Sequence, residues 1–126
     1  MRVLLVVFGL LLSSMGAARA EKVIPSGKPL LLFSASSTNP DCTSLGTVEL
    51  RVVQGPEHGR VSIRRGGVFP TFAAGNPRSA CNTRRVPGIM ATYVSQRGYA
   101  GDDLVVLEVF FPNGSAKRVT IAIRVV

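Results

Sequence analysis

The C-terminal residues read YVSQRGYAGDD (93–103), LVVLEVFF (104–111), PNG (112–114) and SAKRVTIAIRVV (115–126), and they are the most informative part of the chain about its fold. The second and fourth pieces carry apolar residues at alternate positions, which is typical of strands that bury one face. The pieces before them are rich in residues that favour turns, such as Gly, Asn, Pro and Asp. The stretch therefore predicts a sharp corner followed by a β-hairpin that closes the domain.

The register of this hairpin follows from its apolar rows. Both rows occupy odd-numbered positions, namely Val105, Leu107, Val109 and Phe111 in one strand and Val119, Ile121, Ile123 and Val125 in the other. Cross-strand partners share a face, so odd-numbered residues must pair with odd-numbered ones. A two-residue loop would pair Pro112 with Ser115 and send one row into water. A three-residue loop of Pro112, Asn113 and Gly114 keeps both rows inside. Such loops end on a left-handed residue, so we expect a positive φ at Gly114.

Period-two alternation recurs along the rest of the chain, and no segment of useful length shows the helical spacing i, i+3, i+4. We expect strands near Pro29–Ser34, Gly46–Val53, Gly59–Ile63, Gly67–Phe72, Ile89–Val94, Leu104–Phe111 and Ala116–Val125. Pro70 limits the fourth of these to a sheet edge or a bulge. Seven short strands in about 100 residues predict an all-β fold, an immunoglobulin-like antiparallel β-sandwich.

The first twenty residues have the features of a signal peptide. Arg2 gives a short positive region, residues 3–12 form an apolar run too short to span a bilayer, and Ala18 and Ala20 offer small residues for cleavage. No second apolar stretch follows, which disfavours an uncleaved membrane anchor and predicts no transmembrane span after cleavage. We expect a signal peptide at 1–20 and one sandwich domain at 21–126, in the periplasm or outside the cell.

The two cysteines, Cys42 and Cys81, predict a disulfide in an exported chain. The alternative, a pair of free or redox-active thiols, lacks a C-x-x-C spacing.

Charge indicates the kind of partner. Without Arg2 and Arg19, 13 basic residues face 7 acidic ones, a net charge of +6. This balance favours acidic partners, whether polysaccharide, lipid headgroups or another envelope protein. Nucleic acid is not an expected partner, because the protein is exported and lacks the interleaved aromatics of single-strand binders.

Three pieces of the chain, in this order, resemble the bacterial cadherin-like and immunoglobulin-like repeat domain family. They are GPEHGRV (55–61), GYAGDD (98–103) and the closing hairpin. The resemblance covers Gly55 to Val126 and implies an immunoglobulin-like sandwich in an envelope or secreted protein. Many relatives are tandem repeats of large adhesins, whereas this chain carries one domain. It also departs from the pattern at Ser95, where relatives often carry Pro.

The corner residues have structural explanations. Gly98 and Gly101 tolerate backbone conformations that turn the chain sharply. Tyr99 stands where sandwiches often place a corner tyrosine, whose hydroxyl bonds to nearby backbone. We expect Tyr93 in the core and Asp103 capping local backbone amides, with the side chain of its neighbour diverging from it.

Catalytic and metal-binding chemistry have little support. His58 is the one histidine, it lies in a Pro/Gly turn, and no Gly-x-Ser-x-Gly elbow is present. Zinc needs a set of His, Cys or carboxylate ligands, and calcium needs several oxygen ligands. We therefore expect a protein that is not an enzyme and binds no metal or cofactor.

An arginine-rich region is the one unusual chemical feature. Seven arginines and no acidic residue occur from Arg60 to Arg97. Arginine offers a planar fork that suits carboxylates and phosphates. The predicted binding residues are Arg64, Arg65, Arg84, Arg85 and Arg97, around a loop spanning Gly66–Gly88. The alternative is a basic face that is merely solvated.

The sequence thus favours a non-enzymatic, exported binding or adhesion-type module that recognises an anionic partner. Two alternatives remain open. One is a structural subunit of an envelope assembly that pairs through an exposed strand edge. The other is an inhibitor or ligand-binding protein that uses the 66–88 loop.

Overall fold

The computed structural model describes residues 21–126, so the predicted signal peptide at 1–20 lies outside the described residues. Seven strands and one short 3₁₀ helix occur in the order β1 (Glu21–Ile24), β2 (Leu30–Ser36), β3 (Glu49–Gln54), β4 (Gly59–Val68), η1 (Ser79–Thr83), β5 (Val86–Ser95), β6 (Gly101–Phe110) and β7 (Ala116–Val125).

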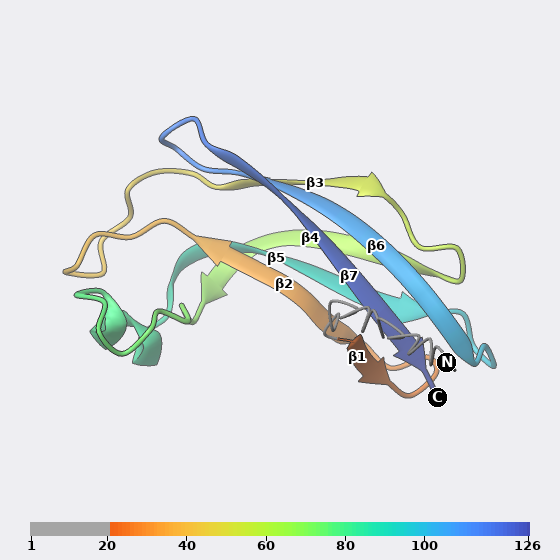
Figure 1. Cartoon of the computed structure of the whole chain (residues 1–126). Helices are drawn as coiled ribbons and strands as arrows, with labels where there is room; N and C mark the ends of the chain where they lie inside the picture. Colours follow the sequence, from red (N-terminus) through yellow and green to blue (C-terminus); the bar gives the residue numbers. More distant parts are fainter. Residues whose placement is uncertain (1–20) are drawn as a thin grey trace, which may run out of the picture.

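The strands form two packed sheets, as Figure 1 shows. One sheet has the order β1-β7-β6-β3 and the other β2-β5-β4. With the strands lettered A to G along the chain, these are the C-F-G and B-E-D groupings of an immunoglobulin-like sandwich. The predicted all-β sandwich is therefore confirmed. One pairing departs from the expected antiparallel pattern, because β1 runs parallel to β7.

The hairpin prediction is confirmed. Val109 pairs with Lys117 and Leu107 with Val119, so odd-numbered residues face odd-numbered ones. The backbone N–H of Phe111 donates to the carbonyl of Ser115 at 2.9 Å, and φ of Gly114 is +87°. The rows that alternation assigned to the interior are buried at Val105, Leu107, Val109, Ile121, Ile123 and Val125.

Two strand predictions were wrong. The predicted set of strands lacks β1, which has only four residues and is held by its pairing with β7. It also divided β4 in two and placed a separate strand at Gly67–Phe72. The glycine pair read as a break instead continues the ladder, since Gly66 pairs with Gly88 and Gly67 with Pro87.

Gly88 shows why three strands can approach so closely here. A β-carbon at Gly88 would lie 2.4 Å from a methyl group of Val68 on β4 and 2.6 Å from the carbonyl oxygen of Ala35 on β2. Only glycine leaves room for both neighbours. The β4–β5 ladder therefore extends into both ends of the 66–88 region, through residues 66–68 and 86–88, and the loop itself comprises residues 69–85.

Candidate anion-binding groove

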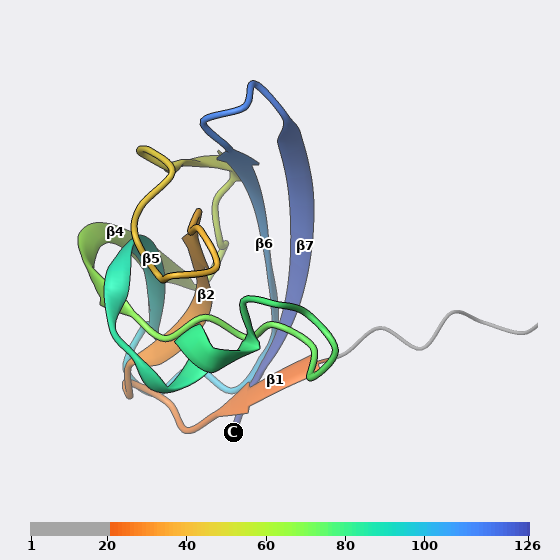
Figure 2. The same cartoon turned by 90° about the vertical axis from the view of Figure 1, so that its left-hand side faces the viewer.

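The 69–85 loop lies at the same end of the sandwich as the β6–β7 turn (Figure 1). Figure 2 looks onto this end, with η1 in the foreground. The predicted disulfide is present and ties Cys42, in the β2–β3 connection, to the buried Cys81 of η1. Asn82 also donates to the carbonyl of Phe72 at 2.8 Å and accepts from its N–H at 2.9 Å. The disulfide thus ties the loop to the β2–β3 connection, and Asn82 joins two parts of the loop to each other.

The five predicted binding arginines do not form one cluster. Arg64 and Arg65 are neighbours on β4, so their side chains lie on opposite faces of the sheet. Arg84 and Arg85 lie between η1 and β5, next to the end of β4 where Gly67 pairs with Pro87. Arg97 follows the other end of β5, and at about 3.3 Å per residue the strand separates it from Arg85 by roughly 30 Å.

Arg65 and Arg85 line the same groove. It has a volume of about 570 Å³ and lies between the β4–β5 ladder and the segment that leads into β3. Its lining residues are Ser44, Gly46, Thr47, Val48, Arg65, Gly66, Gly67, Arg85, Val86, Pro87 and Gly88. This wall is made of small, apolar and basic residues and contains no carboxylate. Its charged groups are therefore both positive.

The side chain of Arg65 on β4 joins the three-stranded sheet to the start of β3 in the other sheet. Its guanidinium donates to the carbonyl oxygen of Val48 at 3.0 Å and to the carboxylate of Glu49 at 2.5 Å. Glu49 neutralises part of its charge, although both side chains are more than half exposed. Arg65 thus positions one wall of the groove and keeps donor groups available to solvent.

Arg85 is the uncompensated charge of the groove. Its side chain lies over Gly67, where an added β-carbon would be 3.3 Å from Cβ and Cδ of Arg85. Its guanidinium carbon lies 5.5 Å from the ring centre of Phe69, a cation–π distance. Among residues 21–126, no acidic group forms an ion pair with Arg85. The aromatic ring therefore orients this arginine without neutralising it.

Acidic partners are distributed unevenly between the two sheets. Glu108 pairs with both Arg51 and Arg118, and Arg124 pairs with Glu21 and Asp102, all on the four-stranded sheet. Within the described part of the chain, ion pairs are absent at Arg60, Arg64, Arg78, Arg84, Arg85 and Arg97, which belong to the other sheet and its connections. Positive charge is thus concentrated on one side of the sandwich.

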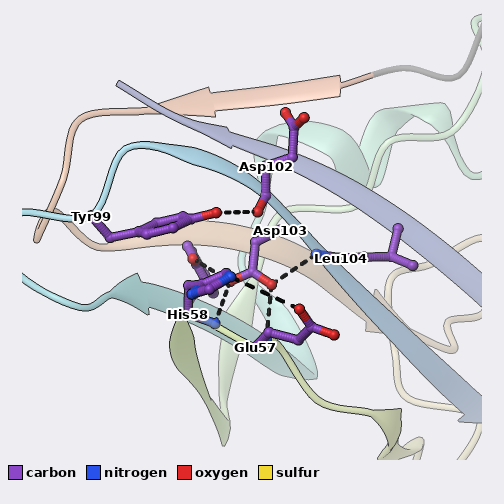
Figure 3. Close-up of polar contacts among 7 residues, drawn as sticks. Glu57, His58, Tyr99, Asp102, Asp103 and Leu104 are labelled. Atoms are coloured by element: carbon purple, nitrogen blue, oxygen red, sulfur yellow. Dashed lines mark hydrogen bonds and ion pairs between the residues drawn. The ribbon is translucent and has the colours of Figure 1, made fainter.

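The predicted corner is confirmed at the opposite end of the molecule. Gly98 and Gly101 have φ values of +81° and +144°. The Tyr99 hydroxyl donates to the backbone carbonyl of Asp102 at 2.6 Å, as Figure 3 shows. The ring of His58 stacks on the ring of Tyr99 with centres 4.0 Å apart, so the histidine packs against the corner.

Asp103 has a larger role than local capping. Its carboxylate accepts from the N–H of Leu104 at 3.0 Å, as expected. It also accepts from the N–H groups of Glu57 and His58, at 2.9 and 3.1 Å (Figure 3). The buried Tyr93 hydroxyl donates to it at 2.8 Å. Asp103 therefore joins the corner to the β3–β4 turn and to the core.

The contacts of Asp103 shift its own pKa and that of Tyr93. Burial opposes ionisation of the Asp103 carboxyl group, but the Tyr93 hydroxyl and three backbone N–H donors outweigh it and hold the pKa of Asp103 below its ordinary value. Burial and the hydrogen bond to Asp103 raise the pKa of Tyr93. Asp103 is thus a buried carboxylate whose hydrogen bonds are structural. Its neighbour Asp102 diverges into solvent, as predicted.

Two further features were sought in the described residues, namely a cluster of metal-ligand side chains and a membrane-spanning helix. Between residues 21 and 126, no three side chains of the His, Cys, Asp or Glu type are grouped so that they could hold a metal ion. Nor does that part of the chain contain a helix with the length and apolar character needed to cross a bilayer.

Comparison with known proteins adds little. No family model matches the chain, and no curated protein matches it. Among solved structures, the solution structure of Amebosin is similar with a TM-score of 0.44 and 15% sequence identity, over 84% of this chain and 88% of that chain. A similarity at this level supports no argument about function.

Proposed function

We propose that the protein is a non-enzymatic, exported binding module of a bacterial envelope that recognises anionic groups through the groove between Arg65 and Arg85. The observation that carries this proposal is the uncompensated guanidinium of Arg85, held over the Phe69 ring beside a groove without carboxylates. Planar guanidinium groups bind carboxylates and phosphates through paired hydrogen bonds. The disulfide supports an oxidising compartment, either periplasmic or extracellular.

We also propose a relationship to the bacterial cadherin-like and immunoglobulin-like repeat domains. The strand order and the tyrosine corner support it. Such domains usually serve as rigid frames that present loops and edges to partners. This chain would use its frame in the same way, with the binding surface at the end that carries the 69–85 loop.

Charge reversal at Arg85 tests the proposed function. We expect Arg85→Glu to weaken binding of lipopolysaccharide and of polygalacturonate by about tenfold or more, because it removes a charge-assisted pair and adds repulsion. Binding would be measured by isothermal titration calorimetry across a salt series, since an electrostatic contact weakens with ionic strength. Arg65 is the less suitable target, because its bonds to Val48 and Glu49 also hold the two sheets.

Arg97→Glu is the matched control. It makes the same change in net charge at the far end of β5 and should leave affinity within about twofold. Equal losses in the two variants would mean that total charge, and not the groove, governs binding. No measurable binding of either probe by the unaltered protein would refute the anion-binding proposal.

A further inference from the structure

β4 is an open edge of the three-stranded sheet. It pairs with β5 on one side, and within residues 21–126 no strand covers its other side. Ten consecutive residue pairs, from Gly59 with Ser95 to Val68 with Val86, follow one another without a register shift. No proline interrupts the segment. β4 therefore presents a long and regular edge that another strand could extend.

The backbone groups on this edge can be assigned. The N–H of Gln96 donates to the carbonyl of His58 at 2.8 Å, which makes residues 58 and 96 a hydrogen-bonded pair. Such pairs alternate along an antiparallel ladder, so the even-numbered residues of β4 bond to β5. The odd-numbered residues direct their N–H and C=O groups away from the sheet. They are Gly59, Val61, Ile63, Arg65 and Gly67.

The other edges are shorter, irregular or partly covered. The pairing of β3 shifts between Val52 and Gln54, and that of β2 shifts between Leu31 and Phe33. β1 covers the Ala122–Val125 portion of β7. Bulges and short edges limit the addition of further strands. β4 lacks these protective features.

The positive charge of β4 indicates which kind of strand could pair with its open edge. β4 carries Arg60, Arg64 and Arg65 and no acidic residue, and the side chain of Arg85 lies over its Gly67. A second copy of β4 would bring arginines against arginines, which is unfavourable. An acidic strand would instead meet the positive charges of Arg60 and Arg64, which lie on the outer face of the sheet.

We propose that β4 binds an extended acidic segment of another protein, which adds to the sheet as a strand beside β4. This inference goes beyond the proposed function, since it uses Arg60 and Arg64 and not the two arginines of the groove, and it names a class of partner. The backbone groups of the odd-numbered residues supply the strand pairing. Peptide strands bind sheet edges in this way, and side-chain contacts then give specificity.

The alternation of β4 defines the partner's sequence pattern. Partner side chains on the outer face lie beside Arg60 and Arg64 and should be Asp or Glu. Partner side chains on the inner face lie beside Ile63, which is 36% exposed, and should be apolar. The expected segment therefore alternates acidic and apolar residues over roughly five to eight positions.

Ile63→Pro is the discriminating variant. The N–H of Ile63 points away from β5, so proline removes an outward donor without breaking the ladder, and proline is tolerated on sheet edges. The probe is an acetylated, amidated octapeptide of four Glu-Val repeats, added to the protein spanning residues 21–126, which carries the whole sandwich. We expect Ile63→Pro to weaken binding by about tenfold and Ile63→Val to change it less than about twofold. A Lys-Val octapeptide should not bind.

Hydrogen exchange gives an independent readout on the unaltered protein. In the free protein, the amides of residues 61, 63, 65 and 67 should exchange quickly, whereas the even-numbered amides of β4 should be protected. The acidic peptide should protect the odd-numbered amides. If Ile63→Pro fails to fold, methylating alternate amide nitrogens of the peptide makes the same test, since only methylation on the pairing edge should abolish binding.

The outcomes separate this inference from the proposed function. The strand-addition proposal would be overturned by any one of three results. The acidic peptide fails to bind the unaltered protein, or it binds Ile63→Pro as well as the unaltered protein, or it leaves the exchange of the odd-numbered amides unchanged. If polygalacturonate binding is still lost in Arg85→Glu, the proposed function stands alone. Concentration-dependent dimers without peptide would show a second copy as the occupant and would also overturn the proposal.

Discussion

Asp103→Ala is expected to lower the free energy of unfolding by about 3–4 kcal/mol, because it leaves the buried Tyr93 hydroxyl and the turn amides of Glu57 and His58 without their acceptor. A loss of that size is a large part of the stability of a small domain. Urea denaturation at neutral pH measures it. Asp102→Ala is the matched control, since its side chain is 72% exposed and, among residues 21–126, forms an ion pair only with Arg124. The control should change stability by less than about 1 kcal/mol.

The effect of Asp103 should also depend on pH. The pKa of its carboxyl group is lowered by folding, so the carboxylate stabilises the fold above the pKa of the unfolded chain, near 4. That stabilisation is lost as the pH falls through the lower pKa of the folded state. The stability difference between the unaltered protein and Asp103→Ala should therefore shrink below about pH 4. A difference that is constant from pH 7 to pH 2, or below about 1 kcal/mol throughout, would contradict the structural role of Asp103.

Replacing both cysteines is expected to have an effect of similar size. Cys42 and Cys81 are 39 residues apart, and closing a loop of that length lowers the entropy of the unfolded chain by the equivalent of about 4 kcal/mol. Cys42→Ser with Cys81→Ser should lose most of this stability, together with packing at the buried Cys81 position. Denaturation curves of the double variant and of the reduced natural protein would measure the loss. Agreement between the variant and the oxidised protein within about 1 kcal/mol would show that the bond contributes little.

The disulfide also bears on the groove. It joins η1 to the β2–β3 connection, and both segments adjoin residues that line the groove. Its loss should therefore increase hydrogen exchange in the 69–85 loop more than in β6 and β7. In the same experiment, hydrogen exchange in the four-stranded sheet measures global stability, and exchange in the 69–85 loop measures the local constraint that the disulfide imposes.

Local patterns were sufficient to predict the closing hairpin. Its odd-numbered apolar rows allow only one register, and Gly114 has the φ sign that this register requires. The corner could also be predicted from local sequence, because Tyr99 bonds to the backbone of a residue only three positions away. The contacts of Asp103 with Glu57 and His58 could not be predicted from the sequence. They join segments about 45 residues apart, and these segments come together only in the packed sandwich.

The binding role of the five arginines stays a prediction, but its assumption that all five belong to one site does not match their places in the fold. That assumption treated nearness in the sequence as nearness in space, but alternation on β4 sends Arg64 and Arg65 to opposite faces, and β5 carries the chain away from Arg85 before Arg97. The opposite wall of the groove, at residues 44–48, lies outside the arginine-rich region, and its small and apolar residues do not indicate a binding site in the sequence. The pairing of acids with arginines on the four-stranded sheet also depended on strand neighbours that the sequence could not supply.

Anion binding in the groove between Arg65 and Arg85 can be observed residue by residue in a nuclear magnetic resonance titration of the domain with polygalacturonate oligosaccharides. The titration follows backbone amides and arginine Nε–H groups. We expect saturable shifts of the Nε–H groups of Arg65 and Arg85 and of the amides of Gly66 and Gly67. The signals of Arg97 and Arg118 should remain in place. Shifts spread evenly over all arginines, or confined to residues outside the groove, would contradict anion binding in the groove.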